Sequence, residues 1–188
     1  MSDVVELLAV VDAVIGALRR HAVPYFITGS FASSVHGEFR ATNDIDIVAQ
    51  LDTSKLVSLF DELSQEFVAD IDQANAALAL GSSFNLIHQR TFLKVDIFPC
   101  VSEFDRCATE RAVSIVVPGA QETLRVASLE DILLAKLRWF RLGGETSQTQ
   151  QRDMRQLVDL NRGQLDAEYL RRWAVFLGVD DILARLTA

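Results

Sequence analysis

The sequence predicts an α+β fold, in which a small mixed β-sheet flanked by helices is followed by a C-terminal helical region. Runs rich in β-branched and aromatic residues, which favour strands, recur between residues 25 and 126. Apolar residues at helical spacing separate these runs, and from Ser128 onward the helical pattern continues alone. A chain of 188 residues can bury one core and add a small helical part. We therefore divide it into an α/β core, residues 1–127, and a helical region, residues 128–188.

Four elements are predicted before residue 50. Apolar residues spaced as on one helix face run from Val4 to Leu18, and Asp3 stands where it can cap that helix. The strand Tyr25–Thr28 stops at a Gly-Ser turn, after which Ser30 is expected to begin a short helix. From residue 44 acidic and apolar residues alternate, which is the period of a strand.

The next segment predicts two helices and a hairpin. Asp52 and the two residues after it are expected to cap a helix that turns its large apolar residues inward, namely Leu56, Leu59, Phe60 and Leu63. Asp72 is expected to cap a second helix, which Gly81 closes. Residues 84–88 and 93–98 have the composition of strands and are joined by a polar turn, so we expect a β-hairpin.

The remaining pattern is helical apart from one pair of short strands. We expect a helix over 102–108 and strands at 113–117 and 123–126. A helix from Ser128 to Phe140 precedes a glycine-rich linker at 143–147. Three more helices are expected, at 148–161, 166–177 and 180–186. Large aromatic residues of this region fit the helical patterns and are expected in the core: Trp139, Phe140 and Trp173.

The acidic residues of the predicted sheet are the first candidates for chemistry. Asp44 and Asp46 are expected on one face of their strand, about 7 Å apart. Like charges at this spacing need free solvent or a cation between them, and Mg²⁺, which prefers oxygen ligands, is the simplest cation. Asp96 stands opposite the apolar residues of a later strand, so three carboxylates can converge. Two structural alternatives remain, a solvated acidic edge strand and a simple ion pair between Lys94 and Asp96.

The turn at Gly29 and Ser30 offers donors for an anion. Gly29 lets the main chain approach a ligand closely, and the free N–H groups that follow suit a phosphate. The alternative for Ser30 is a role as a helix cap only. Phosphate and metal sites are thus expected side by side.

This set of residues resembles the nucleotidyltransferase superfamily of DNA polymerase beta and the aminoglycoside nucleotidyltransferases. The family pattern is an apolar strand, Gly-Gly or Gly-Ser, a spacer, Asp-x-Asp and a third Asp on a later strand. Here Gly29-Ser30, the spacer 31–43, Asp44-Ile45-Asp46 and Asp96 match it in order. The segment 40–46 looks more narrowly like the bacterial AbiEii-type and minimal nucleotidyltransferase-like proteins. Two helical elements, 135–137 and 152–157, also resemble that group, although Gln156 stands where its members often carry Asp.

The resemblance implies the polymerase beta-like fold and an activity for the core. The enzyme would transfer a nucleoside monophosphate from a nucleoside triphosphate, such as ATP, to an acceptor hydroxyl on RNA, protein or a small molecule. Asp44 and Asp46 would hold two Mg²⁺ ions, and Asp96 would bind the second ion or take the acceptor proton. Gly29 and Ser30 would hold the β- and γ-phosphates.

Arg40 and Lys136 complete the predicted nucleotide site. Arg40 precedes the acidic strand and can contact the triphosphate or the acceptor, with a solvated surface position as the alternative. Lys136 interrupts an apolar helix stretch, which favours a phosphate contact at the cleft. Its alternative is a side chain that extends to solvent.

Composition limits the partners and the compartment. The net charge of −8 and the pI of about 4.8 argue against a protein that wraps a long polyanion. Cys100 and Cys107 lack the spacing of a zinc site and are expected to be unpaired thiols. There is no basic leader and no apolar run of membrane length, so we expect a cytoplasmic protein without a membrane partner.

Two other functions remain open for the chain. They are a nucleotide-binding component of a toxin–antitoxin pair with weak or no transfer, and an antibiotic-modifying nucleotidyltransferase. A partner protein or a homodimer is compatible with each of them.

Overall fold

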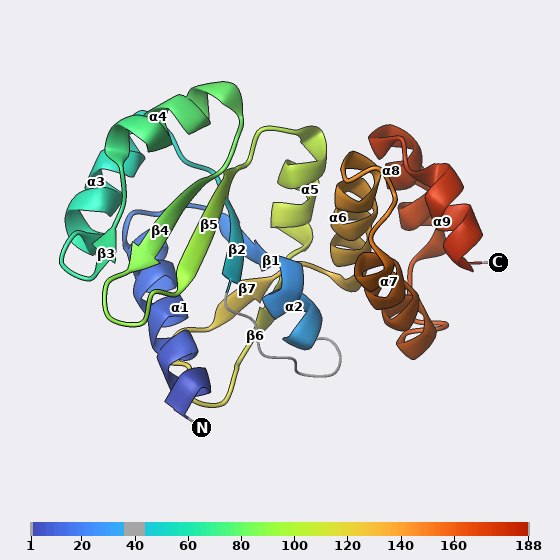
Figure 1. The fold of residues 1–188 in the computed structure, drawn as a ribbon, viewed down its shortest axis with the longest axis horizontal. Coiled ribbons are helices and arrows are strands. Elements are labelled where there is room, and N and C mark those ends of the chain that lie inside the picture. The colour runs from blue at the N-terminus through green and yellow to red at the C-terminus, as the bar shows by residue number, and fades with distance from the viewer. Residues whose placement is uncertain (1, 36–43, 188) are drawn as a thin grey trace. The chain divides into compact units, whose positions relative to one another are not determined.

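The computed structural model of the protein describes residues 2–35 and 44–187. It has the predicted α+β fold, with one mixed sheet in the order β3-β4-β5-β2-β1-β7-β6 (Figure 1). The strands are β1 (Tyr25–Thr28), β2 (Asp44–Ala49), β3 (Phe67–Val68), β4 (Phe84–His88), β5 (Lys94–Pro99), β6 (Val113–Ile115) and β7 (Leu124–Val126). The helices are α1 (Ser2–Arg20), α2 (Gly29–Val35), α3 (Thr53–Leu63), α4 (Ile71–Leu80), α5 (Glu103–Arg111), α6 (Leu129–Leu142), α7 (Gln148–Leu160), α8 (Ala167–Leu177) and α9 (Asp180–Thr187).

The sheet contains both parallel and antiparallel pairs. β2 pairs in parallel with β5 and β1 with β7, whereas β1–β2, β3–β4, β4–β5 and β6–β7 are antiparallel. The hairpin predicted at 84–98 is therefore confirmed. Strand β2, which carries Asp44 and Asp46, therefore lies near the centre of the sheet, with β5 on one side and β1 on the other.

One face of the central strands supplies the core. Ile45 and Ile47 on β2 alternate with the acidic residues and are fully buried, and so are Val95 and Ile97 on β5. Helix α1 buries its apolar stripe completely at Val11, Val14, Ile15 and Leu18. Truncating one such side chain, for example Ile47→Ala, would cost about 2–5 kcal/mol of stability.

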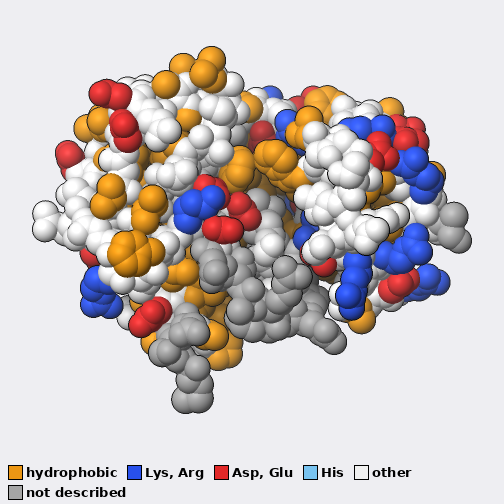
Figure 2. Space-filling model, viewed as in Figure 1, with side chains coloured by type: hydrophobic (Ala, Val, Ile, Leu, Met, Phe, Trp, Pro, Cys, Tyr) orange, Lys and Arg blue, Asp and Glu red, His pale blue; other side chains and the backbone are white. Residues whose placement is uncertain are grey.

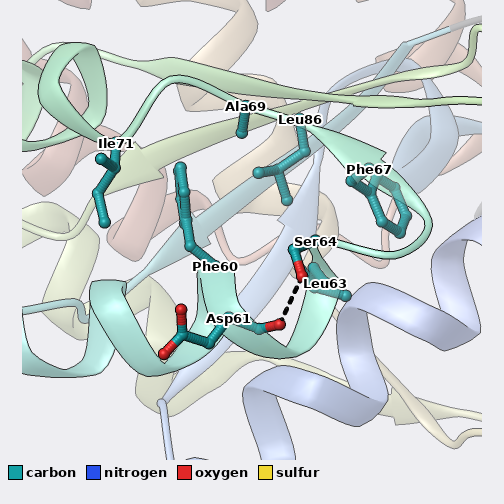
Figure 3. A pocket seen from close by; sticks show the side chains of 8 residues that line it. All are labelled: Phe60, Asp61, Leu63, Ser64, Phe67, Ala69, Ile71 and Leu86. Carbon is teal, nitrogen blue, oxygen red and sulfur yellow. Dashed lines mark hydrogen bonds between the residues drawn. The ribbon is translucent and has the colours of Figure 1, made fainter.

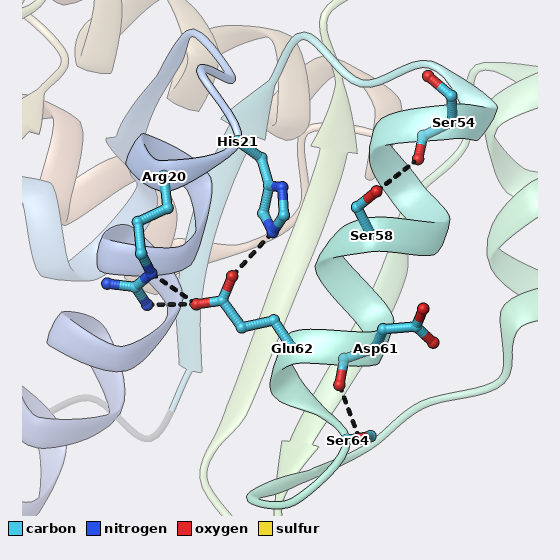
Figure 4. Close-up of polar contacts among 7 residues, drawn as sticks. All are labelled: Arg20, His21, Ser54, Ser58, Asp61, Glu62 and Ser64. Carbon is cyan, nitrogen blue, oxygen red and sulfur yellow. Dashed lines mark hydrogen bonds and ion pairs between the residues drawn. The ribbon is translucent and has the colours of Figure 1, made fainter.

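A charged cluster ties α1 to α3 (Figure 4). Arg20 Nε donates to Glu62 Oε1 at 2.6 Å, and His21 Nε2 lies 2.8 Å from Glu62 Oε2. The hydrogen bond from Arg20 is the main reason why the pKa of Glu62 lies below its ordinary value. These interactions hold the end of α1 against the last turn of α3. The two helices also pack against each other.

The helix caps confirm part of the prediction and correct part of it. Asp52 caps α3 as predicted, accepting from Lys55 N at 2.9 Å. The cap of α4 is Asp70, which accepts from the main chain of Asp72 and Gln73, so the prediction of Asp72 was wrong. Asp70 has the extended main chain that a cap needs, whereas Asp72 already lies in the first turn. Similarly, α1 begins at Ser2, which places Asp3 inside the helix.

The chain forms two compact units, which meet along the sequence at Ala127 and Ser128. The first contains the sheet. The second contains α6 to α9 and the end of α2. The start of α6 is tied to α8, because Asp131 accepts hydrogen bonds from the hydroxyls of Ser128 and Tyr169 at 2.8 and 2.6 Å.

The aromatic residues of the second unit divide between core and surface. Trp173 and Phe140 are buried, as predicted. Trp139 is 53% exposed, so its predicted core position was wrong. It directly precedes Phe140 on α6, and consecutive helix positions point in different directions. No disulfide joins Cys100 and Cys107, as expected. Within the described ranges no helix is both long and apolar enough to cross a membrane.

Candidate active site

Two adjacent parallel strands carry the predicted acidic residues. Asp44 and Asp46 lie on β2 and Asp96 lies on β5, with Asp46 directly opposite Asp96 in the register. Neighbouring strands are about 4.8 Å apart, and partners in a parallel pair share a face of the sheet. The structure therefore brings Asp46 and Asp96 side by side, on the face opposite the buried isoleucines of β2.

Lys94 lies among these acidic residues. It is the register partner of Asp44, and its Nζ lies 2.8 Å from Asp96 Oδ2 and 3.9 Å from Asp44 Oδ1. Figure 2 shows a basic side chain beside a group of acidic side chains near the middle of the view. The hydrogen bond to Asp96 is the main reason why the pKa of Lys94 is raised, with the charges of Asp44 and Asp46 acting in the same direction. Lys94 is therefore cationic at neutral pH.

The ammonium group bears on whether a metal ion fits here. No group of three or more His, Cys, Asp or Glu side chains is arranged to hold a metal ion in the part of the chain that the structure describes. The donors on β2 and β5 are nevertheless carboxylates, the ligand type that Mg²⁺ prefers. The ammonium group of Lys94 already contacts both Asp44 and Asp96. Its position shows where these carboxylates stabilise a positive charge. The type of donor thus suits a hard divalent cation, and in the described structure the ammonium group of Lys94 takes that place.

Gly29 is fixed against Asp46 by the end of β1. Thr28 pairs with Asp46 in the antiparallel register, and Gly29 follows with φ of +69°. A Cβ atom at this position would lie 1.9 Å from Asp46 Oδ2. Both the backbone conformation and the close approach therefore require glycine. Helix α2 begins at Gly29, one residue earlier than predicted, so Ser30 lies in its first turn.

The other two predicted nucleotide contacts are Lys136 and Arg40. Lys136 is on α6, in the second unit, with its Nζ 3.8 Å from Asp153 Oδ2 on α7. Only 18% of its side chain is exposed, which argues against the alternative of a side chain extended to solvent. Arg40 lies outside the described residues.

A separate apolar pocket of about 250 Å³ lies in the first unit, among α3, β3, α4 and β4 (Figure 3). Figure 3 shows the carboxylate of Asp61 directed away from the apolar side chains. The pocket is lined by Phe60, Asp61, Leu63, Ser64, Phe67, Ala69, Ile71 and Leu86. None of these is a cation or a predicted site residue, so the lining does not suit a triphosphate.

Known proteins share the fold at low sequence identity. No protein-family model matches the sequence, and no curated protein matches it. The solution structure of the antibiotic-resistance factor ANT(2'')-Ia matches with a TM-score of 0.61 and 15% identity, covering 96% of each chain. The crystal structure of ANT(2'')-Ia in complex with adenylyl-2''-tobramycin matches with a TM-score of 0.60 and 13% identity, over 92% of this chain and 97% of that one.

A third similar structure is a crystal structure. It is that of an antigenic nucleotidyltransferase-like protein from Paracoccidioides brasiliensis, with a TM-score of 0.55 and 20% identity over 96% of this chain and 92% of that one. At such identities the similarity establishes the fold. The chain therefore has the fold that these proteins share, in agreement with the resemblance seen in the sequence.

Proposed function

We propose that this protein is a nucleotidyltransferase, which transfers a nucleoside monophosphate from a nucleoside triphosphate to an acceptor hydroxyl. The observation that carries the proposal is the close approach of Gly29 to Asp46, which leaves no room for a Cβ atom, together with the alignment of Asp46 with Asp96. The turn at Gly29 and Ser30, which we propose as the anion site, thus adjoins carboxylates that suit a cation. A magnesium triphosphate presents both charges together.

The acidic residues are the proposed catalytic groups. Asp44, Asp46 and Asp96 would hold two Mg²⁺ ions, which would supply positive charge against the negative charge that develops during transfer. The acceptor oxygen forms a bond to the α-phosphorus while the bond to the bridging oxygen breaks, and pyrophosphate leaves with that electron pair. Asp96 either takes the acceptor proton or serves as a ligand of the second cation.

Four other residues are proposed to bind the nucleotide. The Gly29 main-chain N–H and the Ser30 hydroxyl would donate to the β- and γ-phosphates. Arg40 and Lys136 would offset the remaining phosphate charge. The core, residues 1–127, would then carry the chemistry, and the helical region 128–188 would contribute Lys136.

A small-molecule hydroxyl is the acceptor that one observation favours. The similar structure of ANT(2'')-Ia was solved in complex with adenylyl-2''-tobramycin, an adenylylated antibiotic. Antibiotic modification is therefore the second candidate function. A nucleotide-binding role in a toxin–antitoxin pair, which the likeness of residues 40–46 to AbiEii-type proteins suggested, is less favoured, because all three acidic residues are retained.

Labelled nucleotides test the proposal. The protein is incubated with each of the four nucleoside triphosphates labelled at the α-phosphate, with Mg²⁺, and with either a cell extract or aminoglycosides including tobramycin. We expect label on one acceptor class, and none with Asp44→Asn plus Asp46→Asn. Asp61→Asn, which removes an exposed acid on α3, is the matched control. If calorimetry detects no binding of any nucleotide, with or without Mg²⁺, the proposal fails.

A further inference from the structure

Lys94 is placed as a cation within the proposed metal site. Its Nζ reaches Asp96 Oδ2 at 2.8 Å and Asp44 Oδ1 at 3.9 Å, so that it contacts acidic residues on both strands. The Lys94 side chain remains 41% exposed. It therefore has open solvent into which the ammonium group can move without unfolding the sheet.

The physical balance favours exchange with a divalent cation. A lysine carries one strongly hydrated charge on a flexible stem, and partly exposed ion pairs contribute only about 0.2–1 kcal/mol. A divalent ion carries twice the charge and takes several carboxylate oxygens at once. The ammonium group and a divalent ion cannot occupy the same space between Asp44 and Asp96.

We propose that Lys94 is a built-in counter-cation, which neutralises Asp44 and Asp96 when no metal is bound and competes with the divalent ion for them. The inference rests on the proposed function, because it assigns a role to Lys94 within that site. Lys94 is a positioning residue in this scheme: it keeps the carboxylates of β2 and β5 together before the metal arrives.

Two effects of opposite sign follow from this role. Without Lys94 the metal-free protein would lose the ion pairs to Asp96 and Asp44, so it should be less stable. The same change removes the competitor, so the divalent ion should bind more tightly. A lysine that served only to stabilise the sheet would produce the first effect without the second.

The test compares Lys94→Met with Lys55→Met. The chain has three lysines. Lys55 on α3 donates to the Ala22 carbonyl and not to the acidic residues of the site. Lys55→Met therefore changes the net charge by the same amount as Lys94→Met without touching the site. Mn²⁺ affinity is measured by the loss of the free-ion electron paramagnetic resonance signal, and melting is measured in chelator and in Mn²⁺. We expect Lys94→Met to bind Mn²⁺ about three- to tenfold more tightly. It should also melt lower in chelator and gain more from Mn²⁺ than wild type.

The outcomes separate the inference from the proposed function. Wild type that binds Mn²⁺, together with Lys94→Met that binds it equally or less tightly, overturns the counter-cation and leaves the transferase intact. If neither protein binds Mn²⁺, both proposals fail. A tighter site in Lys55→Met as well would assign the effect to net charge and also overturn the inference. Lys94→Gln, which retains polarity, replaces the Met variant if that variant does not fold.

Discussion

At the scale of single residues, Gly29 makes the sharpest prediction. Gly29→Ala places a methyl group 1.9 Å from Asp46 Oδ2 at a φ of +69°. The strain alone costs about 1–2 kcal/mol, or several degrees of melting temperature. The clash must also displace Asp46, so we expect transfer and Mn²⁺ binding to be lost.

Gly144→Ala is the matched control for this change. Gly144 has a φ of +72°, but a Cβ atom there would meet nothing within 4 Å. It should therefore show the loss of stability without the loss of Mn²⁺ binding. Unchanged Mn²⁺ binding in Gly29→Ala would mean that the turn has no part in the metal site.

The pair of acidic residues on β2 gives a second prediction. Asp44→Asn plus Asp46→Asn should abolish transfer, yet the variant should melt in chelator at about the wild-type temperature or above it, because the repulsion that is removed offsets the lost contact between Lys94 and Asp44. The stabilisation by Mn²⁺ should disappear. Calorimetric melting with and without Mn²⁺ measures both effects, and Asp61→Asn serves again as control. A double variant that unfolds would make these acidic residues structural.

At the scale of elements, the cluster that joins α1 to α3 makes stability depend on pH. Because the folded pKa of Glu62 lies below its ordinary value of 4.5, its contribution is present above that pH and is lost as the pH falls through the folded value. Glu62→Gln should lower the melting temperature at pH 7 by about 2–4 °C. The difference from wild type should vanish at low pH.

Thermal melts of both proteins from pH 7 down to pH 3 check this expectation. Glu66→Gln, a nearby exposed acid after α3, is the control. A difference that persists at pH 3 would assign the effect to lost packing of the Glu62 stem instead of its charge.

The elements also show what the sequence can predict. Periodicity located the main helices and strands, and cap residues fixed the starts of α3 and α6, because these signals are local. The cap predicted for α4 was wrong by two residues, because the sequence does not show that Asp70, and not Asp72, has the extended main chain of a cap. Strand register is not local: the pairing of Lys94 with Asp44 depends on how β5 aligns with β2. The sequence could therefore suggest the Lys94–Asp96 pair, but not the second contact to Asp44.

At the scale of the whole molecule, the negative net charge makes Lys136 the residue that best tests whether the second unit helps to bind the nucleotide. A protein of net charge −8 must offset a triphosphate locally. Lys136→Met keeps the stem and removes the charge. We expect nucleotide affinity or transfer to fall by at least about tenfold, or roughly 1.4 kcal/mol, with little change in melting.

Asp153→Asn is the companion variant, because Asp153 is the acidic partner of Lys136 on α7. It removes the ion pair but leaves the cation, so nucleotide affinity should hold or rise. If both variants lose affinity equally, the pair maintains the helices and does not contact phosphate. Unchanged kinetics in Lys136→Met with a strong loss in Lys94→Met would assign the phosphate contact to the sheet.

The parallel alignment of β2 with β5 also governs the order in which the protein can be made. The chain must complete α3, β3, α4 and β4 before Asp96 can lie beside Asp46. A parallel pair always requires such a long crossover, and distant pairings form slowly. A nascent chain still short of β5 on the ribosome would expose β2, with its two carboxylates, along one unpaired edge. Charge on that edge discourages pairing with another chain, so the residues proposed for catalysis would also protect synthesis from aggregation.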